Sequence, residues 1–134
     1  MNRTKARYRI FELLFSYDFN KEGAVREIDE FNIGEENVDF IIETFKGVIC
    51  NLKEIDNIIE NNTRNRKFSR ISRVTLAVLR SAIYEIVFSK LTPIGICVSE
   101  AVNISKKYSS TDESAYVNAV LSSIEKNNNL GKSN

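Results

Sequence analysis

The sequence contains no histidine or tryptophan and only one proline. Without histidine, neither a Ser-His-Asp nor a Cys-His catalytic arrangement can form, and a zinc site loses its commonest ligand. The five glycines are scattered along the chain, so they build neither a phosphate-binding loop nor a dinucleotide fingerprint. These absences argue against the common enzyme classes, and we expect a protein without catalytic residues, metal or cofactor.

Long apolar runs are absent as well. No run reaches the ~20 residues of a membrane-spanning helix, and no signal-peptide pattern opens the chain. The two cysteines, Cys50 and Cys97, both fall within the apolar stripes of predicted helices. We therefore expect a cytoplasmic protein without a membrane anchor, in which both thiols are reduced and buried.

Apolar residues recur at intervals of three and four through most of the chain, a spacing typical of amphipathic helices. This pattern predicts helices at 4–19, 23–31, 35–61, 74–89, 93–108 and 111–124, with a short helix or turn at 68–72. No strand pattern competes, so we predict an all-α fold. The length predicts a single domain, 1–134, with a flexible tail at 127–134.

Charge is unevenly distributed, although the net charge is only +1. Residues 1–20 carry +2, residues 21–60 carry −7, residues 61–90 carry +6, and residues 91–134 are balanced. The net charge therefore says little about affinity for nucleic acid.

The first nine residues form a basic arm that contains four cations and no acid: Arg3, Lys5, Arg7 and Arg9. Cations at the start of a helix oppose its dipole, so their presence there favours an anionic partner such as RNA or DNA. The alternative is a solvated helix start. A second basic cluster is open to the same two interpretations: Arg64, Arg66, Lys67, Arg70 and Arg73. A solvated connection between helices, which can also pair with the acidic segment 21–60, is slightly favoured.

Residues 91–124 contain the clearest helix start signals. Thr92 can cap the first helix and Pro93 can open it, because the fixed φ of proline suits a first helical turn. Ser110 and Glu113 have the spacing of a capping box for the second helix.

The same half of the chain carries a set of short motifs. They are Val78–Glu85, Pro93, Ser99-Glu100-Ala101, Lys107-Tyr108 and Tyr116–Leu121. As a set, over about 68–124, they resemble the C-terminal half of the NusB family of bacterial transcription antitermination factors. Near the start of the chain, Ala6-Arg7 and the stretch Ile10–Phe15 resemble the beginning of the same family.

The resemblance implies two packed three-helix bundles and a non-catalytic protein. It implies binding to boxA-like single-stranded RNA together with the ribosomal protein NusE, and support of RNA polymerase elongation through ribosomal RNA operons. Arg3, Lys5, Arg7 and Arg9 become candidate phosphate contacts. Further candidates for RNA are Asp112, Tyr116 and Asn118, and for the protein partner Phe15, Thr75 and Glu85.

Tyr116 is either a base-stacking aromatic or an ordinary core residue, and the sequence does not decide between the two. The chain also departs from the family pattern. Glu12, Ser99 and Ala119 replace a glutamine, an asparagine and a glycine. Ser69, Arg70 and Thr75 stand where the family has acidic residues that contact NusE, so the NusE interface is the weakest part of the resemblance.

Two other functions remain open at this stage. One is the RNA-recognition module of a ribosomal RNA methyltransferase, although a length of 134 residues leaves no room for a methyl-donor fold. The other is a structural all-α interaction protein that binds no RNA. The sequence fixes neither the RNA sequence recognised nor whether the protein is a monomer or a homodimer.

Overall fold

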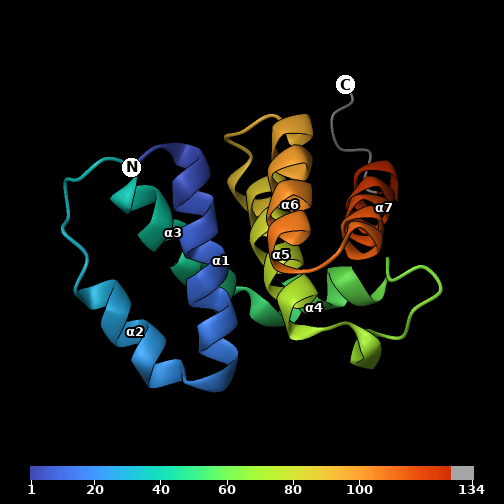
Figure 1. The fold of residues 1–134 in the computed structure, drawn as a ribbon, viewed down its shortest axis with the longest axis horizontal. Coiled ribbons are helices and arrows are strands. Elements are labelled where there is room, and N and C mark those ends of the chain that lie inside the picture. The colour runs from blue at the N-terminus through green and yellow to red at the C-terminus, as the bar shows by residue number, and fades with distance from the viewer. Residues whose placement is uncertain (128–134) are drawn as a thin grey trace.

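The computed structural model describes residues 1–127, which are helical almost throughout (Figure 1). The α-helices are α1 (Arg3–Phe19), α2 (Lys21–Asp29), α3 (Val38–Cys50), α4 (Leu52–Glu60), α5 (Arg73–Ile83), α6 (Ile94–Tyr108) and α7 (Thr111–Asn127). A short 3-10 helix spans Phe68–Arg70, and a π-helical segment, Tyr84–Ser89, continues α5. No strand occurs in this part of the chain, so the all-α prediction is confirmed. Apart from Asn127, which ends α7, the predicted tail lies outside the described residues.

The helices form two groups of three that pack side by side (Figure 1). Helices α1, α2 and α3 make the N-terminal group, and α5, α6 and α7 make the C-terminal group. Helix α1 contacts α5 and α6 across the boundary, and α4 packs against α5. The predicted pair of three-helix bundles is therefore confirmed, with α4 as an additional short helix that packs against α5.

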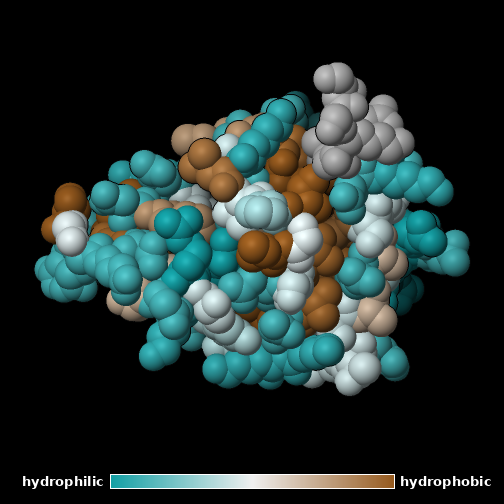
Figure 2. All heavy atoms as spheres, turned by 90° about the horizontal axis from the view of Figure 1, so that it is seen from above, coloured by the Kyte–Doolittle hydropathy of each residue, from teal (hydrophilic) through white to brown (hydrophobic). Residues whose placement is uncertain are grey.

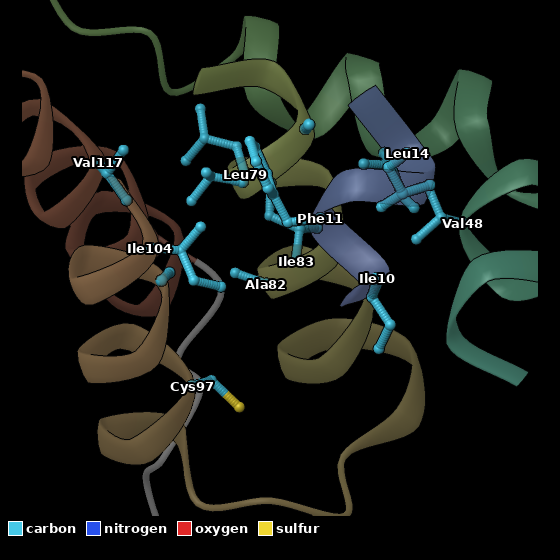
Figure 3. Packing of buried hydrophobic residues seen from close by; sticks show 14 of the residues in the cluster. Ile10, Phe11, Leu14, Val48, Leu79, Ala82, Ile83, Cys97, Ile104 and Val117 are labelled. Carbon is cyan, nitrogen blue, oxygen red and sulfur yellow. The ribbon is translucent and has the colours of Figure 1, made fainter. Parts of the chain in front are cut away.

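One continuous hydrophobic core joins the two groups. Leu79 and Ile83 of α5 lie in the middle of it, with Phe11 of α1 on one side and Ile104 of α6 on the other (Figure 3). Leu79 and Ile83 are fully buried. Because α5 contributes to both sides, this helix holds α1 in a fixed position relative to α6 and α7.

The predicted helix 35–61 is wrong in one respect, because the chain breaks at Asn51 into α3 and α4. Asn51 has φ −114° and ψ 20°, outside the helical range. Its side-chain amide donates to the carbonyl of Gly47 at 2.8 Å, which satisfies one of the free carbonyls at the end of α3. The apolar spacing continues across the break because Ile55 and Ile59 of α4 remain buried, so periodicity alone does not reveal it.

Smaller expectations also need correction. Cys97 is buried as expected, but Cys50, at the end of α3, is exposed. Pro93, rather than Thr92, occupies the cap position of α6, and no side chain caps that helix. The Ser110 hydroxyl accepts from the Glu113 amide at 3.1 Å as predicted, whereas the Glu113 carboxylate bonds Arg66 and Thr75 and does not complete the capping box.

The surface is largely hydrophilic on the face seen from above, with hydrophobic side chains gathered in a broken band across it (Figure 2). Some single hydrophobic side chains are well exposed, including Ile33 at 82% and Leu91 at 83%. Within residues 1–127, no helix combines the length and the apolar character needed to cross a membrane.

Candidate nucleic-acid interface

Arg7 is buried, so its assignment as a phosphate contact is corrected. Its Nε and Nη2 atoms each donate to the Glu85 carboxylate at 2.9 Å, and Nη1 donates to Glu100 at 3.0 Å. Burial alone would lower the pKa of Arg7, but the hydrogen bonds and charge of Glu85 raise it above its ordinary value. Arg7 therefore ties α1 to the C-terminal group instead of facing a ligand.

The other three cations of the basic arm lie on the first turns of α1 and reach the surface to different degrees. Arg3 is exposed; its Nε donates to the Asn37 side chain at 3.0 Å, and its guanidinium lies 4.0 Å from the centre of the Phe40 ring. Arg9 is half-buried and pairs with Glu27. Lys5 is exposed, and its ammonium has no partner among residues 1–127. Lys5 and Arg3 are thus the members of the arm that remain accessible to phosphate.

A cluster of aromatic and basic side chains that no sequence pattern indicates as a whole lies where α1 meets the end of α6. The Lys107 ammonium is 4.9 Å from the centre of the Tyr8 ring and 5.5 Å from that of Tyr108. The two tyrosine rings are 6.1 Å apart, and Tyr108 also packs on Phe11 at 4.7 Å. Partial burial and the charge of Glu12 raise the pKa of Tyr108. Cations beside exposed aromatic rings suit single-stranded nucleic acid, which offers phosphates and unstacked bases.

One half of this cluster is visible in the sequence as the Lys107-Tyr108 motif, at the end of the predicted helix 93–108. Its second half, Tyr8, lies ~100 positions earlier in the chain, on α1. Periodicity cannot join residues so distant in sequence, so the cluster becomes visible only when α1 and α6 are packed together.

Asn118 lies in a groove between α6 and α7 with a volume of about 650 Å³. The groove has a mixed lining to which Lys106, Asn103 and Thr111 contribute polar groups. Asp112 is exposed in the first turn of α7. These two candidate RNA contacts are therefore accessible, next to the end of α6 where Lys106 and Lys107 lie.

Tyr116 is half-buried and does not line the groove that holds Asn118. Its hydroxyl donates to the Thr63 carbonyl at 2.9 Å. The Arg66 guanidinium covers its ring, 3.7 Å from the centre. Tyr116 thus fits neither sequence-based interpretation fully, because it anchors the connection between α4 and α5 while lying under a flat cationic group.

Of the three candidates for a protein partner, only Phe15 reaches the surface. Phe15 is half-buried, and its ring packs between those of Phe11 and Phe19. Thr75 is 0% exposed and donates to Glu113 at 2.9 Å, and Glu85 is 4% exposed and pairs with Arg7. Because Thr75 and Glu85 are buried, a protein partner cannot contact their side chains directly in this structure.

Within residues 1–127, no group of three or more histidine, cysteine, aspartate or glutamate side chains is arranged to hold a metal ion. The features that stand out on this part of the chain are instead cations, aromatic rings and amide groups on adjacent helices.

Comparison with known proteins gives a consistent result. A model of the NusB family matches residues 4–126. The chain is 35% identical to the transcription antitermination protein NusB of Thermoanaerobacter sp. (strain X514), with 100% of this chain and 99% of the relative aligned. The solved structure of T. maritima NusB has a TM-score of 0.82 at 28% identity, covering 94% of this chain and 92% of that one.

A second solved structure contains the antitermination factors NusB and NusE in complex with double-stranded RNA. It matches with a TM-score of 0.79 at 26% identity, covering 93% of this chain and 96% of that one. The match extends over nearly the whole length of both chains and includes both helical groups. The chain belongs to the NusB family.

Proposed function

We propose that this protein is a non-catalytic, cytoplasmic transcription antitermination factor. It binds boxA-like single-stranded RNA together with the ribosomal protein NusE, and it supports elongation by RNA polymerase through ribosomal RNA operons. The full-length similarity to NusB proteins of 35% identity carries this proposal. Residues 1–127 act in it as one RNA-binding unit, without a metal or cofactor.

The RNA surface that we propose runs from the start of α1 to the groove between α6 and α7. Lys5 and Arg3 supply accessible positive charge near one end, and Lys107 supplies it beside the Tyr8 and Tyr108 rings. A single strand offers both phosphates and bases, so this combination of charge and ring faces suits it.

The groove extends this surface with groups that can read base edges. Asn118 and Asn103 carry amides, which both donate and accept hydrogen bonds, and Lys106 adds a charge at the rim. Asp112 lies in the exposed first turn of α7 and can accept from a base amino group. These contacts provide selectivity, whereas the lysines provide affinity that depends on salt.

The proposed NusE contact involves the aromatic end of α1. Phe15 is half-buried and Phe19 is 63% exposed, which leaves apolar ring surface that a protein partner can cover. This surface lies away from Lys5, because α1 is 17 residues long and the two ends are separated by most of its length.

The experiment is a fluorescence-anisotropy titration of a labelled single-stranded RNA that carries a boxA element, with and without NusE. We expect saturable binding that NusE strengthens, and weaker binding to a scrambled strand of equal length. A duplex competitor distinguishes recognition of a single strand from recognition of a helix. Binding to NusE with no affinity for any RNA would contradict the proposal and would leave a structural interaction protein.

A further inference from the structure

The connection between α4 and α5, residues 61–72, is fastened to α7 by several side chains, among them Arg66. Arg66 forms a bidentate salt bridge with Glu113, with Nη1···Oε1 at 3.0 Å and Nη2···Oε2 at 2.9 Å. Glu113 is held in turn by the Thr75 hydroxyl at 2.9 Å. The guanidinium plane is therefore fixed along one edge by a carboxylate that is itself held in place.

One face of the same guanidinium lies on Tyr116. Its central carbon is 3.7 Å from the centre of the ring, and the Tyr116 hydroxyl is bonded to the Thr63 carbonyl. The side chain of Arg66 remains 31% exposed. Within residues 1–127, no hydrogen bond, ion pair or ring contact involves the opposite face of the guanidinium.

The cations around Arg66 do not pair with the acidic segment 21–60, whereas their exposure agrees with the slightly favoured interpretation of a solvated connection. Arg64, Lys67 and Arg70 are exposed and have no side-chain partner among residues 1–127. Arg64 also has a left-handed backbone, with φ 66°, a conformation that costs a non-glycine residue free energy. The connection therefore presents three free cations around one rigid, flat group.

In the same connection lies a polar hollow of about 400 Å³, which shares Thr63 with the Tyr116 contact and which Arg66 itself does not line. Its lining is made of amide, hydroxyl and charged side chains from Glu60 to Asn65, together with Ser123 of α7. The buried Asn62 forms part of the wall; its Oδ1 accepts from Ser123 at 2.9 Å and from Asn127 at 2.8 Å. Amides and hydroxyls of this kind can bond the edge of a nucleobase.

We propose that Arg66, backed by Tyr116 and Glu113, is a stacking platform for one unpaired nucleobase of the bound RNA. This inference rests on the proposed function and adds to it a base-binding position outside the groove between α6 and α7. The base lies on the free face of the guanidinium with its edge toward the polar hollow. Arg64, Lys67 and Arg70 contact the flanking phosphates.

The charge of Arg66 contributes little in this arrangement, because Glu113 already balances it. What the site needs is the flat face, since a guanidinium stacks on a base and an ammonium does not. Arg66→Lys keeps the charge and removes the face, so it separates the two effects. Arg73→Lys is the matched control, because Arg73 is also exposed, also pairs with a carboxylate (Asp18, 3.5 Å), and also lies over a ring (Phe19, 5.2 Å).

The test is a scan of the boxA RNA in which one nucleotide at a time is made abasic. For the unsubstituted protein, and equally for Arg73→Lys, removal of the base that stacks on Arg66 should weaken binding about tenfold in Kd, equivalent to ~1.4 kcal/mol, in addition to the penalties at positions bound by Tyr8 or the groove. For Arg66→Lys, the intact RNA should bind about tenfold more weakly, and the abasic penalty at that one position should fall below about twofold. Binding to NusE should not change.

A second measurement uses the unsubstituted protein, so it does not depend on the folding of any variant. 2-Aminopurine placed at the sensitive position should lose fluorescence when the complex forms, because stacking quenches it. If no position shows both an abasic penalty and quenching of 2-aminopurine, the proposal that Arg66 is a stacking platform is wrong. It is also wrong if folded Arg66→Lys keeps the penalty, or if it loses affinity for NusE and not for RNA. If the unsubstituted protein binds no RNA at all, the proposed function is contradicted, and the proposed stacking platform is contradicted together with it.

Discussion

Arg7 and Glu85 are joined by two hydrogen bonds of 2.9 Å, and both side chains are more than nine-tenths buried. The pair connects the second turn of α1 to the π-helical segment after α5, and Glu100 of α6 completes it from the other side. It therefore fastens the N-terminal group of helices to the C-terminal group through buried charge.

Replacing Arg7 with alanine should destabilise the protein by about 3–5 kcal/mol, because it leaves Glu85 buried without a cation. The free energy of unfolding from urea titration gives this value directly. Arg26→Ala is the control, since Arg26 is exposed and its side chain has no partner among residues 1–127; it should change stability by less than ~0.5 kcal/mol. A folded, equally stable Arg7→Ala protein would mean that the pair does not hold the two groups together.

The helices could be predicted from the sequence, because their apolar spacing reflects the core directly. Ile10 and Leu14 of α1 and Val117 and Leu121 of α7 repeat every fourth position and are all buried. Helices can be predicted from this local spacing without information about which residues they contact across the core.

The candidate site was predicted less well, for a different physical reason. Arg7 looked like its neighbours Lys5 and Arg9 in a run of alternating cations, yet it finds its carboxylate partner 78 positions later. Tyr8 and Tyr108 are similarly distant in the chain and close in space. Charge and aromatic content are visible in a sequence, but which groups neutralise one another depends on the packing of distant helices.

The two thiols should react at very different rates. Cys50 is exposed, whereas Cys97 is buried, and burial together with the charge of Glu85 raises the pKa of Cys97 to about 12. Because the thiolate is the reactive form, an Ellman assay at pH 8 should show one fast thiol in the native protein. The second should appear only in urea. Cys50→Ser should abolish the fast phase, and its persistence would show that Cys97 is accessible.

Stability should depend on pH through Glu113. Its hydrogen bonds with Arg66 lower the pKa of this carboxyl below its ordinary 4.5. Because the pKa of Glu113 is lower in the folded than in the unfolded protein, the ionised carboxylate stabilises the fold at pH values above 4.5. This stabilisation is lost as the pH falls below 4.5 and through the pKa of the folded state. Glu113→Gln should therefore destabilise the protein more at pH 7 than at pH 3.

Urea titrations of both proteins at the two pH values measure this difference. Glu43→Gln serves as the control, because Glu43 is exposed on α3 and has no side-chain partner among residues 1–127. It should change the free energy of unfolding by less than ~0.5 kcal/mol. An equal effect of Glu113→Gln at pH 7 and pH 3 would mean that its ion pair with Arg66 contributes nothing.

Tyr8 should contribute to RNA binding through its ring. Tyr8→Leu keeps a bulky apolar side chain next to Tyr108 but removes the ring face, so it should weaken binding to the boxA RNA by ~1–3 kcal/mol if a base stacks there. The dependence of affinity on salt should stay the same, because no charge is lost. Tyr17→Leu is a control on the same helix, since Tyr17 packs edge-on against Phe45 of α3 at 5.8 Å and faces the N-terminal group.

Lys5, unlike Tyr8, should contribute to the salt dependence of RNA binding and not to its sequence preference. If its free ammonium contacts a phosphate, Lys5→Gln removes one released counterion, and the slope of log Kd against log salt should fall in magnitude by ~0.7 for a single strand. The loss of affinity should be similar for boxA and scrambled RNA, because a phosphate contact carries no sequence information. Lys53→Gln, an exposed lysine on α4, should leave the slope unchanged. An unchanged slope for Lys5→Gln in the folded protein would place the RNA elsewhere than at the start of α1.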